Sequence, residues 1–425
     1  MCGHTGSYNR GCEALVQSKV ININECGVKK SMHLASFDEL NPNETIKTKY
    51  LHIMPMDSKL ITGGTINMIN ENPDDFDINE HLFIVTSKTN YDLFGHYNNV
   101  VYEPEILNKR YDKFIEYGIC SEYIFMHSLP LSLRQMLLLD TKIANKIIWC
   151  VWGHDLYRKP PILKGNISIY RKLRRLAYLF LFDIAFVNKV KKFSAIGISF
   201  KYDVLEVRRI YGDGISVLMA PYGFGYPKSD VDNVIAEYKK NKKVKNKTLK
   251  IMIGHSSFPF LKHEEILSKL LKYKEENITI TIPLSYGEEE YGKHIEIIAK
   301  QLFEEKVEII KDYMSPTDYV KFLMSVDVAI FDYEHQSALG NIMLLLYLGK
   351  KVYLSNKGII HWAMRAEGIK TYDANDIGNV PFEVLSSEHA FDERAVIYSG
   401  YYLNENNIME QWKTTFKGLR QNRIF

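Results

Sequence analysis

The chain has few cysteines for its length, and their number argues against two ways of stabilising a protein. Five of the 425 residues are cysteine, and no two of them form a Cys-x-x-Cys pair. An odd count without such pairs argues against a disulfide framework and provides no zinc-ligand pattern. We therefore expect a protein of a reducing compartment, the cytoplasm, without a bound metal.

The sequence also lacks segments that would target or anchor it. The first residues, Met1–His4, have neither a basic start nor an apolar core, so we expect no signal peptide. The longest apolar run, Leu176–Val187, is interrupted by Asp183 and falls short of the ~20 residues that span a bilayer. A net charge of +3 is too small to indicate nucleic-acid binding, although positive charge is concentrated locally.

Short apolar runs alternate with helical patterns along the chain, which predicts an α/β protein with parallel sheets. At roughly 150 residues per domain, the length favours two domains. The strands expected in the first half are Tyr50–Pro55, His81–Thr86, Val100–Tyr102, Tyr123–His127, Ile147–Trp152, Ile184–Val187, Ala195–Gly197 and Ile215–Met219. Those expected in the second half are Leu249–Ile253, Ile278–Pro283, Val307–Ile310, Val328–Phe331 and Lys351–Leu354.

A lysine-dense stretch without apolar periodicity, Lys239–Lys250, indicates an exposed linker between the two halves. We expect a first domain at 46–240, a second at 248–390, and a C-terminal helical segment at 391–425 that packs back toward the first domain. Two parallel-sheet domains joined in this way would face each other across a cleft.

The most informative stretch of the first half runs from Trp149 to Tyr157. An apolar run that predicts a buried strand breaks at Gly153 and presents His154 and Asp155 just beyond the strand end. In open α/β sheets, ligands bind beyond the carboxyl ends of the strands. We therefore expect a reaction centre here, beside the basic residues between Arg158 and Arg175. A turn with a solvated aspartate is the alternative interpretation.

Two turns of the second half also follow predicted strands. In Gly254-His255-Ser256-Ser257, small and hydroxyl residues at a strand end can bind a phosphate through backbone N–H groups and hydroxyls. There is no GxGxxG or GxxxxGK motif, so a plain tight turn is the alternative. The second turn contains Tyr286, which either stacks on a nucleobase or packs internally.

The third turn, Asp332–Asn341, gives the strongest prediction of a ligand site. Gly340 stands at the start of a helix without a polar face, and a helix N-terminus carries roughly +0.5 of a charge that suits a diphosphate. Glu334, His335 and Gln336 would be costly to leave unpaired near such an apolar segment, so we expect them to face a ligand. A polar loop that caps the helix is the alternative.

Several of these motifs occur in the order found in a known family. They are the Trp-x-x-Trp-Gly-x-Asp-Leu-Tyr pattern of Trp149–Tyr157, Arg174–Ala177, Ile253–Ser256 with His263-Glu264, Pro283–Tyr286, and Gln336-x-x-x-Gly340. From about Tyr50 to the end, the chain resembles the TDP-N-acetylfucosamine:lipid II N-acetylfucosaminyltransferase family, glycosyltransferase family 56. The family resembles two-domain enzymes of the GT-B architecture. In these the C-terminal domain holds the nucleotide-sugar and the N-terminal domain holds the acceptor.

The resemblance implies transfer of an amino-deoxy sugar, of the 4-acetamido-4,6-dideoxygalactose type, from a dTDP donor to a polyprenyl-diphosphate-linked saccharide. It shifts the emphasis in the first motif from His154 to Asp155 and Gly153. The residues expected at the donor are Gly254, His255, Ser256, Tyr286, Glu334, Gln336, Gly340 and Asn341. Those expected at the acceptor or diphosphate loop are Gly63, Gly64, Gly153 and Tyr157. Asn341 and the loop 334–337 depart from the enterobacterial form of the family, which bears on the identity of the donor sugar.

Glycosyl transfer requires a polarised acceptor hydroxyl and a stabilised diphosphate leaving group. Asp155 is our first candidate for the general base and His127 the second, since each lies at a predicted strand end. The acidic cluster Asp74–Asp77 predicts a surface turn, so we expect a metal-independent enzyme without cofactors. The basic residues between Arg158 and Arg175 alternate with apolar ones, which favours a peripheral position on anionic lipid at the inner face of the cell membrane.

Residues 1–45 resemble a different family. The segment Gly3–Leu15, with His33–Asp38, is similar to the start of polysaccharide pyruvyl transferases, but the rest of such an enzyme does not follow. The alternative functions are therefore pyruvyl transfer from phosphoenolpyruvate and non-catalytic binding of a sugar nucleotide.

Overall fold

The structure is a computed structural model that describes residues 48–55, 59–130, 133–134, 137–138, 142–153, 155–157, 169–223, 228–240 and 248–421. It divides into two compact units. The first unit extends to Tyr222 and resumes at Met409, and the second unit comprises Gly223–Ile408. The pyruvyl-transferase-like segment 1–45 lies outside the described residues.

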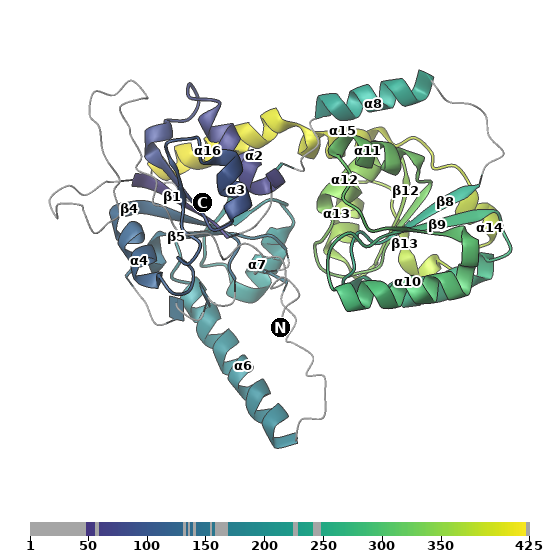
Figure 1. Cartoon of the computed structure of the whole chain (residues 1–425), viewed down its shortest axis with the longest axis horizontal. Coiled ribbons are helices and arrows are strands. Elements are labelled where there is room, and N and C mark those ends of the chain that lie inside the picture. Colours follow the sequence, from purple (N-terminus) through teal and green to yellow (C-terminus); the bar gives the residue numbers. More distant parts are fainter. Residues whose placement is uncertain are drawn as a thin grey trace. The chain divides into compact units, whose positions relative to one another are not determined.

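The first unit is built on a seven-stranded sheet in the order β3-β2-β1-β4-β5-β6-β7, with every pairing parallel. The strands are β1 (Thr48–Met54), β2 (His81–Val85), β3 (Val100–Tyr102), β4 (Ser121–His127), β5 (Ile147–Cys150), β6 (Ala195–Ile198) and β7 (Val217–Met219). Its helices are α2 (Lys59–Asn70), α3 (Lys88–Phe94), α4 (Tyr111–Cys120), α6 (Ile169–Val190) and α7 (Asp203–Tyr211). Helices cover both faces of the sheet (Figure 1), which is why its strands are apolar along their length.

The second unit repeats this plan with six parallel strands in the order β10-β9-β8-β11-β12-β13. The strands are β8 (Leu249–Ile253), β9 (Ile278–Pro283), β10 (Val307–Ile310), β11 (Val328–Phe331), β12 (Lys351–Leu354) and β13 (Tyr372–Asp373). The helices are α8 (Lys228–Lys240), α9 (His263–Leu270), α10 (Glu289–Phe303), α11 (Pro316–Ser325), α12 (Leu339–Tyr347), α13 (Ile359–Ala366), α14 (Phe382–Ser386) and α15 (Glu393–Leu403). Each unit is thus a doubly wound α/β domain, as the alternation in the sequence predicts.

Helix α16 (Glu405–Arg420) begins in the second unit and completes the first. Trp412 Nε1 donates to the carbonyl of Pro221 at 2.8 Å, and Thr415 Oγ1 donates to the carbonyl of Met219 at 2.6 Å. Phe416 is buried against the rings of Tyr50 and His81, at 4.8 and 4.9 Å between centroids. The apolar face of α16 is therefore part of the core of the first unit.

One expected strand is wrong. Ile184–Val187 lies inside helix α6, because its apolar residues belong to the 3.6-residue period of a long amphipathic helix. Phe182, Phe186 and Val190 of this helix are buried in the core of the first unit. Within the described ranges, no helix combines the length and the apolar character needed to cross a membrane.

Candidate functional site

The turns predicted to hold a ligand in the second unit meet at one edge of its sheet. Strand β8 lies between β9 and β11, so the strand order reverses beside β8. Because all strands are parallel, the turns after β8, β9 and β11 leave the sheet at the same carboxyl edge. A reversal of this kind is the usual ligand position in open α/β sheets.

The first turn depends on the glycine at position 254. Gly254 has a φ of 63°, a left-handed conformation that favours glycine. A Cβ added there would lie 2.8 Å from Nε2 of the buried His263. This close approach of backbone and imidazole fixes the path of the chain into His255.

A Gly254→Ala substitution tests this contact, and Gly349 provides a matched control. We expect Gly254→Ala to lower the free energy of unfolding of the second unit by about 2–3 kcal/mol, which combines left-handed backbone strain with the clash against His263. Gly349 has a similar φ of 67° with nothing near its added Cβ. Gly349→Ala should therefore show only the strain of about 1–2 kcal/mol. Equal losses in urea unfolding would contradict the contact with His263.

His255 is the centre of the candidate site. Its side chain is buried among the rings of Tyr286, Phe331 and Tyr333, with centroids 6.0–6.4 Å away. Nε2 of His255 lies 3.4 Å from Oγ of Ser337, whereas Nδ1 has no hydrogen-bond partner within the described part of the chain. Burial, followed by the neighbouring His263 and His335, lowers the pKa of His255 to about 3. The imidazole is therefore neutral and can donate one hydrogen bond.

The turn after β9 is tied to the turn after β8 through Ser257. Its N–H and its hydroxyl both donate to the carbonyl of Tyr286, at 2.8 and 2.9 Å. The carbonyl of Ser257 accepts from the N–H of Glu288 at 2.9 Å. These hydrogen bonds between the two turns hold Tyr286 beside His255, and Tyr286 stays 53% exposed. An exposed ring in this position can stack on a planar ligand.

The turn after β11 leads into helix α12 without a side-chain cap. The N-cap residue is Ala338, with a φ of 50°, and its side chain offers no hydrogen bond to the helix. The first N–H groups of any helix have no partner inside it, and here Gly340 and Asn341 lie in that first turn. Among the described atoms, Oε1 of Gln336 is buried without a partner, whereas Glu334 is exposed. The helix start therefore offers donors and a nearby acceptor to a ligand.

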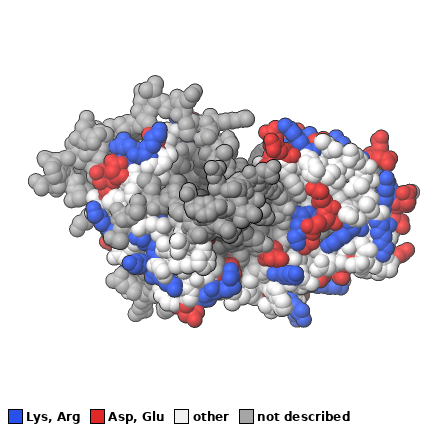
Figure 2. Space-filling view, turned by 90° about the horizontal axis from the view of Figure 1, so that it is seen from below, with Lys and Arg blue, Asp and Glu red and all other residues white. Residues whose placement is uncertain are grey.

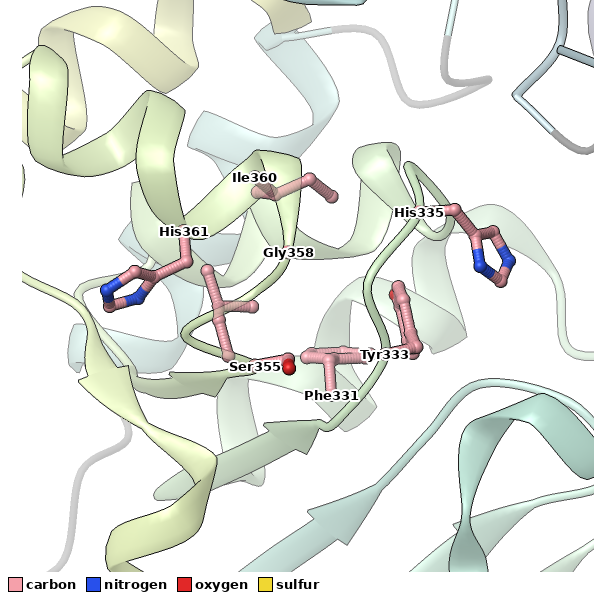
Figure 3. Close-up of a pocket in the computed structure, with 8 residues that line it drawn as sticks. Phe331, Tyr333, His335, Ser355, Gly358, Ile360 and His361 are labelled. Carbon is pink, nitrogen blue, oxygen red and sulfur yellow. The ribbon is translucent and has the colours of Figure 1, made fainter. Parts of the chain in front are cut away.

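A small pocket, partly open to solvent, lies next to this turn. Figure 3 shows His335 and His361 on opposite sides of it, with Phe331 and Ser355 between them. The lining residues are Phe331, Tyr333, His335, Leu354, Ser355, Gly358, Ile360 and His361. The sequence prediction missed Ser355, Gly358 and His361. Ser355 directly follows strand β12, a place that could have identified it, whereas Gly358 caps helix α13 and His361 lies within that helix.

Asp155, the first candidate for a general base, instead holds its own loop together. Its Oδ1 accepts from the N–H of Trp152 at 2.7 Å, and its Oδ2 accepts from Nε1 of Trp149 at 2.8 Å and from the N–H of Leu129 at 3.2 Å. The backbone carbonyl of Asp155 accepts from Arg134 at 2.7 Å. A buried carboxylate with three donors is arranged for stability, so its geometry favours a structural role over the predicted proton transfer.

His127, the second candidate, is also occupied. Its Nε2 lies 3.0 Å from Nδ1 of His52, and its Nδ1 lies 3.0 Å from the hydroxyl of Tyr222. His52 continues to Nδ1 of His81 at 3.0 Å, which makes a buried chain of three imidazoles. Burial lowers the pKa of His127 to about 3. Both ring nitrogens are engaged in the core, which leaves none for the acceptor.

The remaining predicted residues of the first unit fall in two places. Gly153, with a φ of 81°, begins the turn in which its carbonyl accepts from the N–H groups of Leu156 and Tyr157. The hydroxyl of Tyr157 donates to Asp203 at 2.7 Å. Gly63 and Gly64 lie inside helix α2, so the expected glycine-rich loop is wrong. Two adjacent glycines do not predict a helix, because glycine is a poor helix former.

Other expectations concern residues that the structure does not describe. His154 and the basic segment 158–168 lie outside the described residues. Within the described ranges, no three His, Cys, Asp or Glu side chains are grouped as a metal would require. The independence from metals stays a prediction.

The comparisons with known proteins point to one enzyme class. The profile of the 4-alpha-L-fucosyltransferases, glycosyl transferase group 56, matches residues 206–406. A glycosyltransferase from Rickettsia africae is similar over 88% of this chain and 99% of its own, with 13% identity and a TM-score of 0.55. HepE from Anabaena, solved with UDP-glucose, is similar over 87% and 99%, with 13% identity and a TM-score of 0.58.

Sucrose-phosphate synthase from Thermosynechococcus elongatus has the same two-unit fold over 88% of this chain and 100% of its own, with 10% identity and a TM-score of 0.61. These likenesses establish the architecture, and the profile match covers the segment that contains the candidate site. The chain is therefore a glycosyltransferase of the GT-B type, and its residues 206–406 match the profile of glycosyl transferase group 56.

Proposed function

We propose that the protein transfers an amino-deoxy sugar from a dTDP-sugar to a polyprenyl-diphosphate-linked saccharide. The sugar is of the 4-acetamido-4,6-dideoxygalactose type, and the product belongs to surface polysaccharide biosynthesis. Support comes from the family resemblance of both halves and from the profile match over the second unit. The lipid-linked acceptor implies a cytoplasmic enzyme at the inner face of the membrane.

The main support for a donor site is a pair of buried polar atoms beside helix α12, Nδ1 of His255 and Oε1 of Gln336, that have no hydrogen-bond partner among the described residues. When Ser337 donates to Nε2 of His255, Nδ1 carries the proton and becomes a donor without a partner among the described residues. A diphosphate oxygen near the helix start would accept hydrogen bonds from that N–H and from the first N–H groups of the helix. Oε1 of Gln336 is an acceptor and suits a sugar hydroxyl or a base N–H.

In this arrangement the residues that bind the dTDP-sugar stabilise its diphosphate leaving group. Negative charge develops on the diphosphate as the glycosidic bond breaks, and fixed N–H donors stabilise it without reorganisation. A neutral His255 acts by hydrogen bonding and does not pair as a cation. Tyr286 would stack on the thymine ring, and Glu334 and Asn341 would contact the sugar or ribose.

The test is nucleotide binding by the intact chain. We expect dTDP to raise the thermal midpoint more than UDP, GDP or phosphoenolpyruvate do. His255→Ala should weaken dTDP binding by about 10–100-fold, the usual effect of a lost hydrogen bond to a charged group. His294→Ala is the matched control, because His294 is an exposed residue of α10 paired with Glu264 in the same unit.

Other outcomes would redirect the proposal. Selective stabilisation by phosphoenolpyruvate would favour pyruvyl transfer, and a preference for UDP would change the donor. Binding of dTDP-sugar without transfer to any lipid-linked acceptor would favour a non-catalytic binding protein. Unchanged dTDP affinity in His255→Ala would remove His255 from the site.

A further inference from the structure

Helix α6 exposes a group of large apolar side chains. Phe180, Leu181 and Ile184 are 66%, 65% and 46% exposed. Residues four apart lie on one face of a helix, and the residue after Phe180 lies at the edge of that face. Contiguous exposed apolar residues of this kind mark an interaction surface.

The opposite face of the same helix is already occupied. Phe182, Phe186 and Val190 are buried in the core of the first unit, and the rings of Phe182 and Phe186 stack at 6.3 Å. Figure 1 shows α6 extending well beyond the sheet of its unit. The exposed face therefore belongs to a helix that is anchored by its C-terminal half and does not need that face for its own folding.

The charges of α6 indicate what covers this face. Its first seven residues contain Arg171, Lys172, Arg174 and Arg175, and its one acidic residue is Asp183. By contrast, Figure 2 shows basic and acidic residues intermixed on the coloured part of its view. A helix with aromatic and aliphatic residues on one face and clustered arginine and lysine suits the interface of an anionic bilayer.

We infer that α6 is the membrane-docking element, with Phe180, Leu181 and Ile184 inserted among the acyl chains of an anionic leaflet. The helix lies in the plane of the interface, where its 22 residues extend ~33 Å. This inference deepens the proposed function, since a polyprenyl-linked acceptor is itself held in that leaflet. A second copy of the chain or another protein is the competing occupant.

The experiment measures co-sedimentation of the full chain with vesicles, in the absence of any substrate. Vesicles of phosphatidylcholine with phosphatidylglycerol should bind the protein, and pure phosphatidylcholine should bind it at least about ten-fold more weakly. The triple variant Phe180→Ser, Leu181→Ser and Ile184→Ser should lose at least about ten-fold in vesicle affinity, because three apolar side chains no longer insert.

Exposed apolar residues of the second unit provide the matched control. Tyr313, Ile297 and Ile397 are 78%, 56% and 67% exposed, and serine at all three should leave vesicle binding unchanged. Both triple variants should keep dTDP binding, which shows that they fold. Equal vesicle binding by the α6 variant and the wild type would overturn the inference, as would a dimer in sedimentation velocity that only the α6 variant dissolves. Sugar transfer without vesicle binding would reject the docking helix while leaving the proposed function intact.

Discussion

Replacing Asp155 with alanine should lower the free energy of unfolding of the first unit by about 3–5 kcal/mol. The substitution leaves the N–H groups of Leu129 and Trp152 and the indole N–H of Trp149 without their acceptor. Each buried donor left unpaired costs about 1–3 kcal/mol, and partial relaxation of the loop keeps the sum below the maximum. Urea unfolding followed by circular dichroism measures the loss.

Two further variants make this prediction specific. Asp155→Asn should lose nearly as much stability, because an amide N–H₂ would face N–H donors. Asp213→Ala, at a side chain that is 96% exposed in the same unit, should change stability by less than about 0.5 kcal/mol. A double-mutant cycle between Asp155→Ala and Trp149→Phe should give a coupling of about 1–2 kcal/mol. If Asp155→Asn kept full stability and lost turnover by about 100-fold, proton transfer by Asp155 would be reinstated.

Lowering the pH should unfold the first unit at a mildly acidic value. Burial lowers the pKa of both His81 and His127 to about 3, and burial with the two neighbouring imidazoles places the pKa of His52 well below its ordinary range. In the unfolded chain each imidazole titrates near ~6.5. The unfolded state therefore binds more protons below that value, and stability falls as the pH drops from about 6.5 toward 3.

The size of this effect follows from the number of imidazoles. Each buried imidazole lowers the free energy of unfolding by up to about 1.36 kcal/mol for each unit by which the pH falls. The three imidazoles together lower it by up to about 4 kcal/mol per pH unit. With a total stability of about 5–15 kcal/mol, the unit should unfold between about pH 5 and pH 3. A Trp362→Phe background leaves Trp149, Trp152 and Trp412, all in the first unit, as the fluorescent reporters.

His81→Phe removes one of the three buried imidazoles and should therefore reduce the number of protons bound on unfolding by about one. His81 is chosen because it is the last imidazole of the histidine chain. His96→Gln, at an exposed residue of the same unit, is the control and should leave the uptake unchanged. A pH profile that is flat between about 6.5 and 4 would contradict the neutral histidine chain.

The sequence predicted the sheets because parallel strands buried on both faces are short apolar runs with clear ends. Val307–Ile310 and Val328–Phe331 were predicted with the bounds that the structure shows. Ile184–Val187 failed because four apolar residues do not reveal whether the period is two or 3.6. The turns of the candidate site were predictable for the same reason as the strands, since each directly follows a strand end.

The histidine chain was not predictable from the sequence. His52, His81 and His127 lie on three different strands, and their contact depends on β1 being placed between β2 and β4. His52 pairs in register with Phe83 and Phe125, which are two residues from His81 and His127. Side chains two residues from a pairing partner are diagonal neighbours on one face of the sheet. Only the strand order reveals this. Around Asp155, the same holds for the N–H of Leu129 after β4, whereas Trp149 and Trp152 are close to Asp155 in the sequence.

The return of α16 to the first unit has a consequence for biosynthesis. A ribosome makes Gly223–Ile408 before it makes Trp412 and Phe416, which cover the imidazoles of the first unit. The core of the first unit is therefore built from two segments of the sequence, and it stays incomplete until the whole second unit has been synthesised. Domains usually fold in the order of their synthesis, but the first unit, although it is begun first, cannot complete its core before α16 is made. His52, His81 and His127 can therefore become a buried, neutral histidine chain only after α16 has been made and has packed on the sheet.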